Sequence, residues 1–230
     1  MMIRPVSIAV LLCMMASGGD AIAGDIRKVK SIQFRGLRLL TKYDVIRGVR
    51  LEAAADGIVI DVDSLERALS GNSLIKSFGI EESGGRLMVS VAERRPVLIA
   101  VVAGKDGSSL YELDEDHAII SKNDVHTDRV PVLYLVSLKL SADGATGRVR
   151  SLISLLERVK RKIAPLYREI AEIYLDETSI RVVARGRRTS FVLRPRDTDF
   201  IKLRYIIGYC DRTGECPEEI NLSDNPVIVR

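Results

Sequence analysis

The sequence contains no tryptophan, and aromatic residues make up only 5% of its 230 residues. Proteins that hold single-stranded nucleic acid stack its bases on aromatic side chains, so this composition argues against a nucleic-acid partner. Only two histidines and three cysteines are present. Zinc sites are usually built from four such ligands, and neither histidine lies near Cys210 or Cys216 in the sequence. We therefore expect no metal site.

Motifs that carry catalysis are also missing. The sequence has no phosphate-binding loop, no nucleotide-binding glycine fingerprint and no Gly-x-Ser-x-Gly elbow. His117 and His126 lie in polar stretches without an evident nucleophile partner, and we expect both to be exposed. The carboxylates of residues 114–116 are of a type that binds calcium, but their place between two short strand-like segments favours a hairpin turn. We therefore expect no enzyme activity and no cofactor.

The overall balance of residues indicates a folded protein. Hydrophobic residues make up 47% and charged residues 29% of the chain, which is typical of globular domains. The 35 basic and 31 acidic residues are mixed along the sequence and give a net charge of +4. Such a balance is mostly solvated surface, although it permits weak attraction to an anionic membrane or cell-wall polymer.

The first 23 residues have the three parts of a secretory signal. A short positive start precedes an apolar core of about ten residues, and Ala21 and Ala23 follow at the spacing of a cleavage site. The core is shorter than the roughly 20 residues that span a bilayer as a helix. A cleaved signal peptide and an uncleaved N-terminal membrane anchor both remain open for residues 1–23. Both alternatives place residues 24–230 outside the cytoplasm.

Two cysteines lie close together near the C-terminus. Cys210 and Cys216 bracket a short polar segment that contains Gly214, and such a loop can bring two sulfur atoms together. An oxidising compartment would preserve the bond. A disulfide and two unpaired thiols are both compatible with this pattern.

The first folded region is predicted to combine three strands and two helices. Thr41 can cap the first helix, and Asp61 or Asp63 can cap the second. Gly57 is expected in a loop between them. The β-α-α-β-β order predicts a small α+β module with both helices on one face of a three-stranded sheet. The predicted strands are 29–34, 75–81 and 86–93, and the predicted helices are 42–49 and 64–70.

The region after Pro96 is predicted to form a larger, mostly antiparallel β domain with two covering helices. Apolar residues recur at helical spacing over 148–164, and Pro165 is expected to end that helix. A second helix is predicted over 200–209. Short strands separated by polar turns make up most of the remainder. The predicted strands are 97–102, 110–113, 118–120, 130–135, 170–175, 180–184, 190–193, 219–222 and 226–229.

The stretch "VSVAERRPVLIA", residues 89–100, joins these two regions. Proline lacks a backbone N–H and restricts the residue before it to extended geometry. Pro96 can therefore end one strand and direct the chain into the next. We expect the four residues between the strands to form an interdomain joint and not a catalytic site. They are Glu93, Arg94, Arg95 and Pro96.

The chain ends in a short strand-like segment, residues 224–230. A last strand is a natural sheet edge, and an edge exposes unpaired backbone groups to which a partner can add a strand. Pro226 suits the beginning or the free side of such a strand because it cannot donate to the ladder. An ordinary last strand and a partner-accepting edge are both compatible with these residues.

Several stretches follow the order of a known family. They are "IQFRGLRLLTKYDVI", "IDVDSLERALSGNSLIKSFGIE" and "GRLMVSVAERRPV", followed by "LYELDEDHAIIS", "RVPVL" and "EINLSDNPVIVR". The first three resemble the FtsQ-type POTRA domain of the FtsQ/DivIB family of bacterial cell-division proteins, including its Glu-Arg-x-Pro joint. The last three resemble the family's β domain. The resemblance implies a POTRA domain over residues 27–96 and an extracytoplasmic β domain over residues 97–230.

The resemblance also implies a function. Members of this family are non-enzymatic, membrane-associated scaffolds of the divisome, located in the cell inner membrane and facing the periplasm. They bind FtsB and FtsL partners, in part through the terminal strand of the β domain, and their POTRA domain is linked to further division proteins. Carried over by position, the candidate partner-binding residues are Asp224, Asn225, Pro226, Val227, Ile228, Val229 and Arg230.

One departure and one alternative accompany this resemblance. Family members usually have a cytoplasmic tail and a full transmembrane helix, whereas residues 18–20 interrupt the apolar stretch here. An upstream start and a signal-bearing periplasmic variant are both compatible with that difference. The alternative function is an envelope transport or assembly factor whose POTRA-like module guides outer-membrane or secreted chains.

Overall fold

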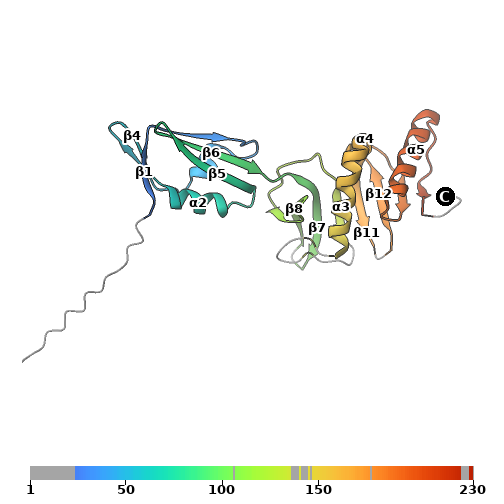
Figure 1. Ribbon diagram of the computed structural model, residues 1–230. Coiled ribbons are helices and arrows are strands. Elements are labelled where there is room, and N and C mark those ends of the chain that lie inside the picture. Colours follow the sequence, from blue (N-terminus) through green and yellow to red (C-terminus); the bar gives the residue numbers. More distant parts are fainter. Residues whose placement is uncertain are drawn as a thin grey trace, which may run out of the picture.

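The computed structural model describes residues 24–105, 107–135, 140, 145, 147–176, 178–223 and 228–229. The protein is a mixed α+β structure, as predicted, with its elements arranged in two regions that lie end to end (Figure 1). Each region has its own hydrophobic core. One cluster of buried side chains runs from Val29 to Val91, and the other runs from Val97 to Leu222.

The N-terminal region contains a three-stranded sheet covered on one face by two helices. Its strand order is β2-β6-β5, with β2 and β6 parallel and β5 and β6 antiparallel. Side chains alternate along β6, so Leu87, Val89 and Val91 are buried beneath the helices. The elements are β2 (Ser31–Arg35), α1 (Lys42–Ile46), α2 (Val62–Ser70), β5 (Ile75–Ser83) and β6 (Arg86–Glu93).

Both helices of this region begin at capping residues. The Thr41 hydroxyl accepts a hydrogen bond from the Asp44 N–H, and the Asp44 carboxylate in turn accepts one from the Thr41 N–H. Asp61 caps α2 by accepting from the Ser64 N–H at 3.0 Å. The first helix is shorter than the predicted 42–49, because Arg47 leaves the helical conformation (φ −62°, ψ 115°) and Gly48 follows in the left-handed conformation at φ 86°.

A second small sheet corrects the prediction of a loop around Gly57. Its strand order is β1-β4-β3, and all its pairs are antiparallel. Gly57 begins β4, and a Cβ atom there would clash with the Val29 carbonyl of β1, so the close approach requires glycine. The Asp56-Gly57 pair is a hairpin signal in the sequence that could have indicated this turn. The strands are β1 (Ile26–Val29), β3 (Leu51–Ala54) and β4 (Gly57–Asp61).

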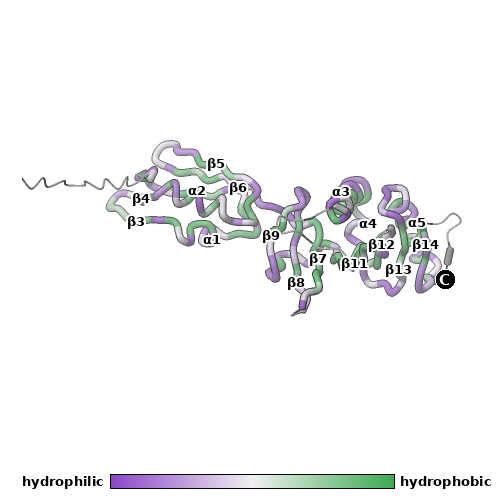
Figure 2. The backbone as a smooth tube through the Cα atoms, turned by 90° about the horizontal axis from the view of Figure 1, so that it is seen from below, coloured by the Kyte–Doolittle hydropathy of each residue, from purple (hydrophilic) through white to green (hydrophobic). Residues whose placement is uncertain are grey.

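The C-terminal region is built on a nine-stranded sheet with the order β15-β14-β13-β12-β11-β10-β7-β8-β9. Five neighbouring pairs are antiparallel and three are parallel, so the sheet is mostly antiparallel, as predicted. Figure 2 shows a hydrophobic stretch along β7, which lies within the sheet. The strands are β7 (Pro96–Gly104), β8 (Gly107–Asp114), β9 (Ile119–Lys122), β10 (Val132–Leu135), β11 (Ile170–Leu175), β12 (Ile180–Ala184), β13 (Ser190–Leu193), β14 (Glu219–Asn221) and β15 (Ile228–Val229).

Three helices in the described part of this region, and not the predicted two, pack against the sheet (Figure 1). Pro165 was expected to stop the long helix, but it lies in the first turn of an additional short helix. A proline is accommodated there because the first N–H groups of a helix have no partner within it. The helices are α3 (Gly147–Lys162), α4 (Ala164–Glu169) and α5 (Asp197–Thr213).

The opposite face of the C-terminal sheet carries a more polar set of side chains. Along β12 the residues alternate between buried and partly or fully exposed positions. Tyr134 of β10 and Tyr174 of β11 stack with ring centroids 4.8 Å apart, whereas their neighbours Leu133 and Ile173 are fully buried. The sheet is therefore apolar on the helix side and mixed on the other.

Candidate functional site: the joint and the outer sheet edge

Glu93 is the last residue of β6, and its carboxylate holds the loop that follows β2. It accepts three backbone hydrogen bonds, from the N–H groups of Arg38, Leu39 and Leu40, at 2.8–2.9 Å. Partial burial acts to raise the pKa of the Glu93 carboxyl, but these three hydrogen bonds outweigh it and lower the pKa. Glu93 therefore has a structural role in the joint as an ionised acceptor.

Replacing Glu93 by glutamine is expected to lower the free energy of unfolding by about 1–2 kcal/mol at pH 7, because the charge is lost and one acceptor oxygen becomes a donor. The lowered pKa gives the effect a pH dependence. The contribution of the carboxylate is complete above the pKa of the unfolded chain and is lost as pH falls through the lower folded pKa. Urea denaturation of the wild type and of Glu93→Gln from pH 7 to pH 3 measures this pH dependence. A difference in the free energy of unfolding that grows as the pH falls would contradict the prediction.

Arg94 connects the end of β6 to the turn after β8. Its backbone N–H donates to the Leu74 carbonyl at 2.7 Å. Its guanidinium Nη1 lies 2.5 Å from the Asp114 carboxylate and 3.5 Å from that of Asp116. The Asp114 side chain is 1% exposed and also accepts from the Ala118 N–H at 2.8 Å. Arg94 is therefore the counter-charge of a buried carboxylate in the other region of the protein.

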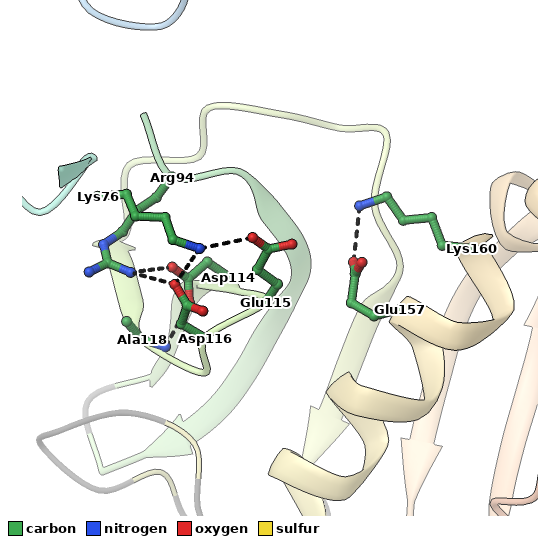
Figure 3. A network of polar contacts seen from close by, with 8 residues as sticks. All are labelled: Lys76, Arg94, Asp114, Glu115, Asp116, Ala118, Glu157 and Lys160. Carbon is green, nitrogen blue, oxygen red and sulfur yellow. Dashed lines mark hydrogen bonds and ion pairs between the residues drawn. The ribbon is translucent and has the colours of Figure 1, made fainter. Parts of the chain in front are cut away.

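Two further residues of the N-terminal region contact the C-terminal region beside this pair. Lys76 Nζ of β5 lies 2.9 Å from the Glu115 carboxylate and 2.7 Å from that of Asp116 (Figure 3). The Ser73 hydroxyl donates to the Ile120 carbonyl at 2.6 Å. We call Lys76, Arg94, Asp114, Glu115 and Asp116 the joint network.

The joint network gives the acidic turn a role that its sequence did not reveal. Residues 114–116 lie at the end of β8 and in the turn towards β9, and their carboxylates face the cations of the joint. In the described ranges, no group of three or more His, Cys, Asp or Glu residues could hold a metal ion. These carboxylates lie 20–40 residues from Arg94 and Lys76 in the sequence, so no local pattern indicated the pairing.

The other two joint residues differ from Glu93 and Arg94. Pro96 begins β7 and pairs with Asp114, where the ladder shifts by one residue before Leu98. Arg95 is exposed, and its side chain has no ion pair within the described part of the chain. The four predicted joint residues thus lie together but divide into two anchors, one strand start and one free cation.

The expectation that both histidines are exposed is wrong, because each is partly buried. His126 is 21% exposed, and its Nδ1 lies 2.7 Å from the carboxylate of the fully buried Glu112. That carboxylate also accepts from the N–H groups of His126 and Thr127 and from the Ser121 hydroxyl. His117 is partly exposed, with Nε2 3.3 Å from the Ser154 hydroxyl. Glu112 therefore anchors the loop before β10, which brings residues 127–130 to the joint.

The candidate partner-binding segment is described in part. Ile228 and Val229 form β15 and pair antiparallel with Asn221 and Ile220 of β14. Strand β15 stands first in the order of the nine-stranded sheet, so it is an edge strand. The other predicted residues of this segment, Asp224, Asn225, Pro226, Val227 and Arg230, lie outside the described residues.

A disulfide lies next to this edge. Cys210 of α5 and Cys216 are bonded, with Cα atoms 5.1 Å apart. Gly214 ends α5 in the left-handed conformation at φ 73°, which turns the chain so that Cys216 returns to the helix. The bond ties the end of α5 to the segment that leads into β14.

No helix in the described ranges is both long and apolar enough to cross a bilayer. In comparisons with known proteins, no family model matches this chain, and no curated protein matches it.

Proposed function

We propose that this protein is a non-enzymatic scaffold of the bacterial divisome that binds FtsB/FtsL-like partners through the outer edge of its C-terminal sheet. The observation that carries the proposal is the position of β15 at the edge of the nine-stranded sheet. A partner strand can extend the sheet there by main-chain hydrogen bonds, which is a common way of recognising an extended segment. The resemblance of residues 27–230 to the FtsQ/DivIB family gives the partner class.

The N-terminal region supports the same proposal. We propose that residues 27–96 are an FtsQ-type POTRA domain and residues 97–230 its β domain. The succession β2, α1, α2, β5 and β6 with the sheet order β2-β6-β5 agrees with the predicted β-α-α-β-β module, to which β1 and the β3–β4 hairpin are additions. Further division proteins would bind this module.

The compartment is part of the proposal. The N-terminal segment, as an anchor or a cleaved signal, would place residues 24–230 on the periplasmic side of the inner membrane. The disulfide between Cys210 and Cys216 supports this location, because such bonds persist in oxidising compartments.

Localisation in dividing cells tests the proposed function. Immunofluorescence of the untagged protein is expected to show a band at midcell, and depletion is expected to give filaments without septa. A chain ending at Ser223, which lacks β15, is the matched control and is expected to fail to restore septation at equal abundance. A uniform envelope signal together with normal division on depletion would refute the scaffold role.

A second candidate function is the envelope assembly factor. Strands β2 and β5 are the edges of the small sheet, and an unfolded outer-membrane or secreted chain could pair with either. This role predicts that depletion lowers the amount of outer-membrane proteins while septa still form. The depletion experiment therefore separates the two functions.

A further inference from the structure

A pocket of about 710 Å³ lies at the joint, and Arg94 is the member of the joint network that lines it. It is formed by three segments of the chain: the loop after β2, the β6–β7 connection and the loop before β10. Pockets of this size accommodate several side chains or a small ligand. Its lining residues include Arg38, Leu39, Glu93, Arg95, Pro96, Arg129 and Val130. We call it the joint pocket.

The joint pocket carries an excess of positive charge. Arg38, Arg95 and Arg129 are exposed, and none of them takes part in an ion pair within the described part of the chain. Glu93 is the acidic residue of the lining, and its oxygens already accept three backbone N–H groups. Arg94 also borders the pocket, but its guanidinium is held by Asp114. The positive charge of Arg38 helps to lower the pKa of the Glu93 carboxyl, so the pocket offers an incoming anion Arg95 and Arg129 first and Arg38 in addition.

The same pocket has an apolar component. Leu39 is 40% exposed and Pro96 is partly exposed, so both present apolar surface, whereas Val130, which also lines the pocket, is buried. A second, smaller pocket of about 380 Å³ on the β5–β6 strands shares Gly36, Val91 and Ala92 with the first. The joint pocket thus has a small apolar area in addition to its arginines.

We propose that the joint pocket binds an extended acidic peptide segment of a protein partner. Its carboxylates would pair with Arg38, Arg95 and Arg129, and an apolar side chain would contact Leu39 and Pro96. Guanidinium groups bind carboxylates with two parallel hydrogen bonds, which suits this chemistry. A single small oxyanion fits less well, because it would fill a small part of the pocket and leave the apolar surface uncovered.

This site is separate from the proposed partner edge. The joint pocket adjoins β6 and β7, whereas β15 lies at the end of the nine-stranded sheet, with five strands between it and β7 (Figure 1). An acidic segment could therefore occupy the joint while another partner extends the sheet. The inference does not depend on the divisome role.

Fluorescence anisotropy with the full chain tests the proposal. The probe is a labelled eight-residue peptide of alternating glutamate and leucine. Saturable binding is expected, and the variant Arg95→Glu/Arg129→Glu is expected to weaken it at least tenfold. The control Arg188→Glu/Arg204→Glu makes the same charge change at two exposed arginines outside the pocket that have no ion pair in the described part of the chain. Its affinity for the peptide is expected to stay within twofold of the wild type. The neutral variant Arg95→Gln/Arg129→Gln repeats the test if the acidic one unfolds.

Two further comparisons identify the recognised chemistry. A peptide with glutamine in place of glutamate is expected to lose binding, and Leu39→Gln is expected to weaken the acidic peptide several-fold. Absence of saturable binding at millimolar peptide would overturn the proposal, as would an equal loss in the pocket and control variants. Binding to phosphatidylglycerol vesicles tests whether the pocket recognises a membrane surface instead of a peptide. If they bind with the same dependence on Arg95 and Arg129 while the peptide does not bind, the pocket recognises a membrane surface and the peptide proposal fails.

Discussion

Replacing Arg94 by alanine is expected to lower the free energy of unfolding by about 3 kcal/mol. The change leaves the Asp114 carboxylate, 1% exposed, without its counter-charge and with the Ala118 N–H as its remaining hydrogen-bond donor. Removing one partner of a buried ion pair typically costs about 3–5 kcal/mol, because an uncompensated charge stays in a poorly solvated place. The lower end applies here since the Arg94 side chain is 23% exposed. Urea denaturation at pH 7 measures the loss.

The adjacent arginine provides the control for this prediction. Arg95 is exposed and has no ion pair in the described part of the chain, so Arg95→Ala should change stability by no more than about 0.5 kcal/mol. The double variant Arg94→Met/Asp114→Leu should recover most of the loss, because replacing a buried ion pair by apolar residues of similar volume is often close to neutral. Equal effects of Arg94→Ala and Arg95→Ala would refute the role of the pair.

Blocking the outer edge of the nine-stranded sheet is expected to weaken binding of the FtsB/FtsL-like partner at least about 100-fold, which corresponds to ~2.7 kcal/mol. Backbone N–H groups point alternately to the two sides of a strand, so one of Ile228 and Val229 directs its N–H towards β14 and the other towards the free edge. Proline at the free-edge position removes a donor that the partner needs and leaves the β14 pairing intact. Isothermal titration with the purified extracytoplasmic part of the partner measures the loss.

The two proline variants serve as controls for each other. Ile228→Pro and Val229→Pro differ by one position, and only the variant at the free-edge position should lose partner affinity without a change in thermal unfolding. Ile228→Lys tests side-chain contacts separately from the backbone. Unchanged partner affinity in all three variants would refute strand addition at β15, and the joint pocket would remain unaffected by that result.

Local patterns in the sequence predicted most of the regular elements. Three kinds of pattern depend on neighbouring residues alone, so a short stretch of sequence is enough to recognise them. They are the helix caps Thr41 and Asp61, the alternation of Leu87, Val89 and Val91, and the helical spacing in α3. The β3–β4 hairpin and α4 were missed for local reasons as well. The Asp56-Gly57 turn and the tolerance of the first helical turn for Pro165 carry weaker signals than the patterns around them.

The chemistry of the joint could not be obtained in the same way. The stretch "ERRP" shows that charges stand between two strands, but not which charges are buried, paired or free. Arg94 meets Asp114 across 20 residues, and Glu93 meets the backbone of Arg38 across 55. These contacts depend on the register of β6 with β5 and of β7 with β8, because the register determines which side chains distant in sequence lie close together.

Residue order alone thus settled most element types, the cap of α1, the place of the joint and the short spacing of Cys210 and Cys216, because each depends on contacts within a few residues. The packed structure decided that Arg94 is a partly buried anchor of Asp114 while Arg95 is exposed and has no ion pair in the described part of the chain, although both border the joint pocket. Successive residues in extended backbone point to opposite sides, and the surroundings on each side are built by distant segments. Burial and charge pairing at the joint are therefore properties of the assembled sheets and not of the local sequence.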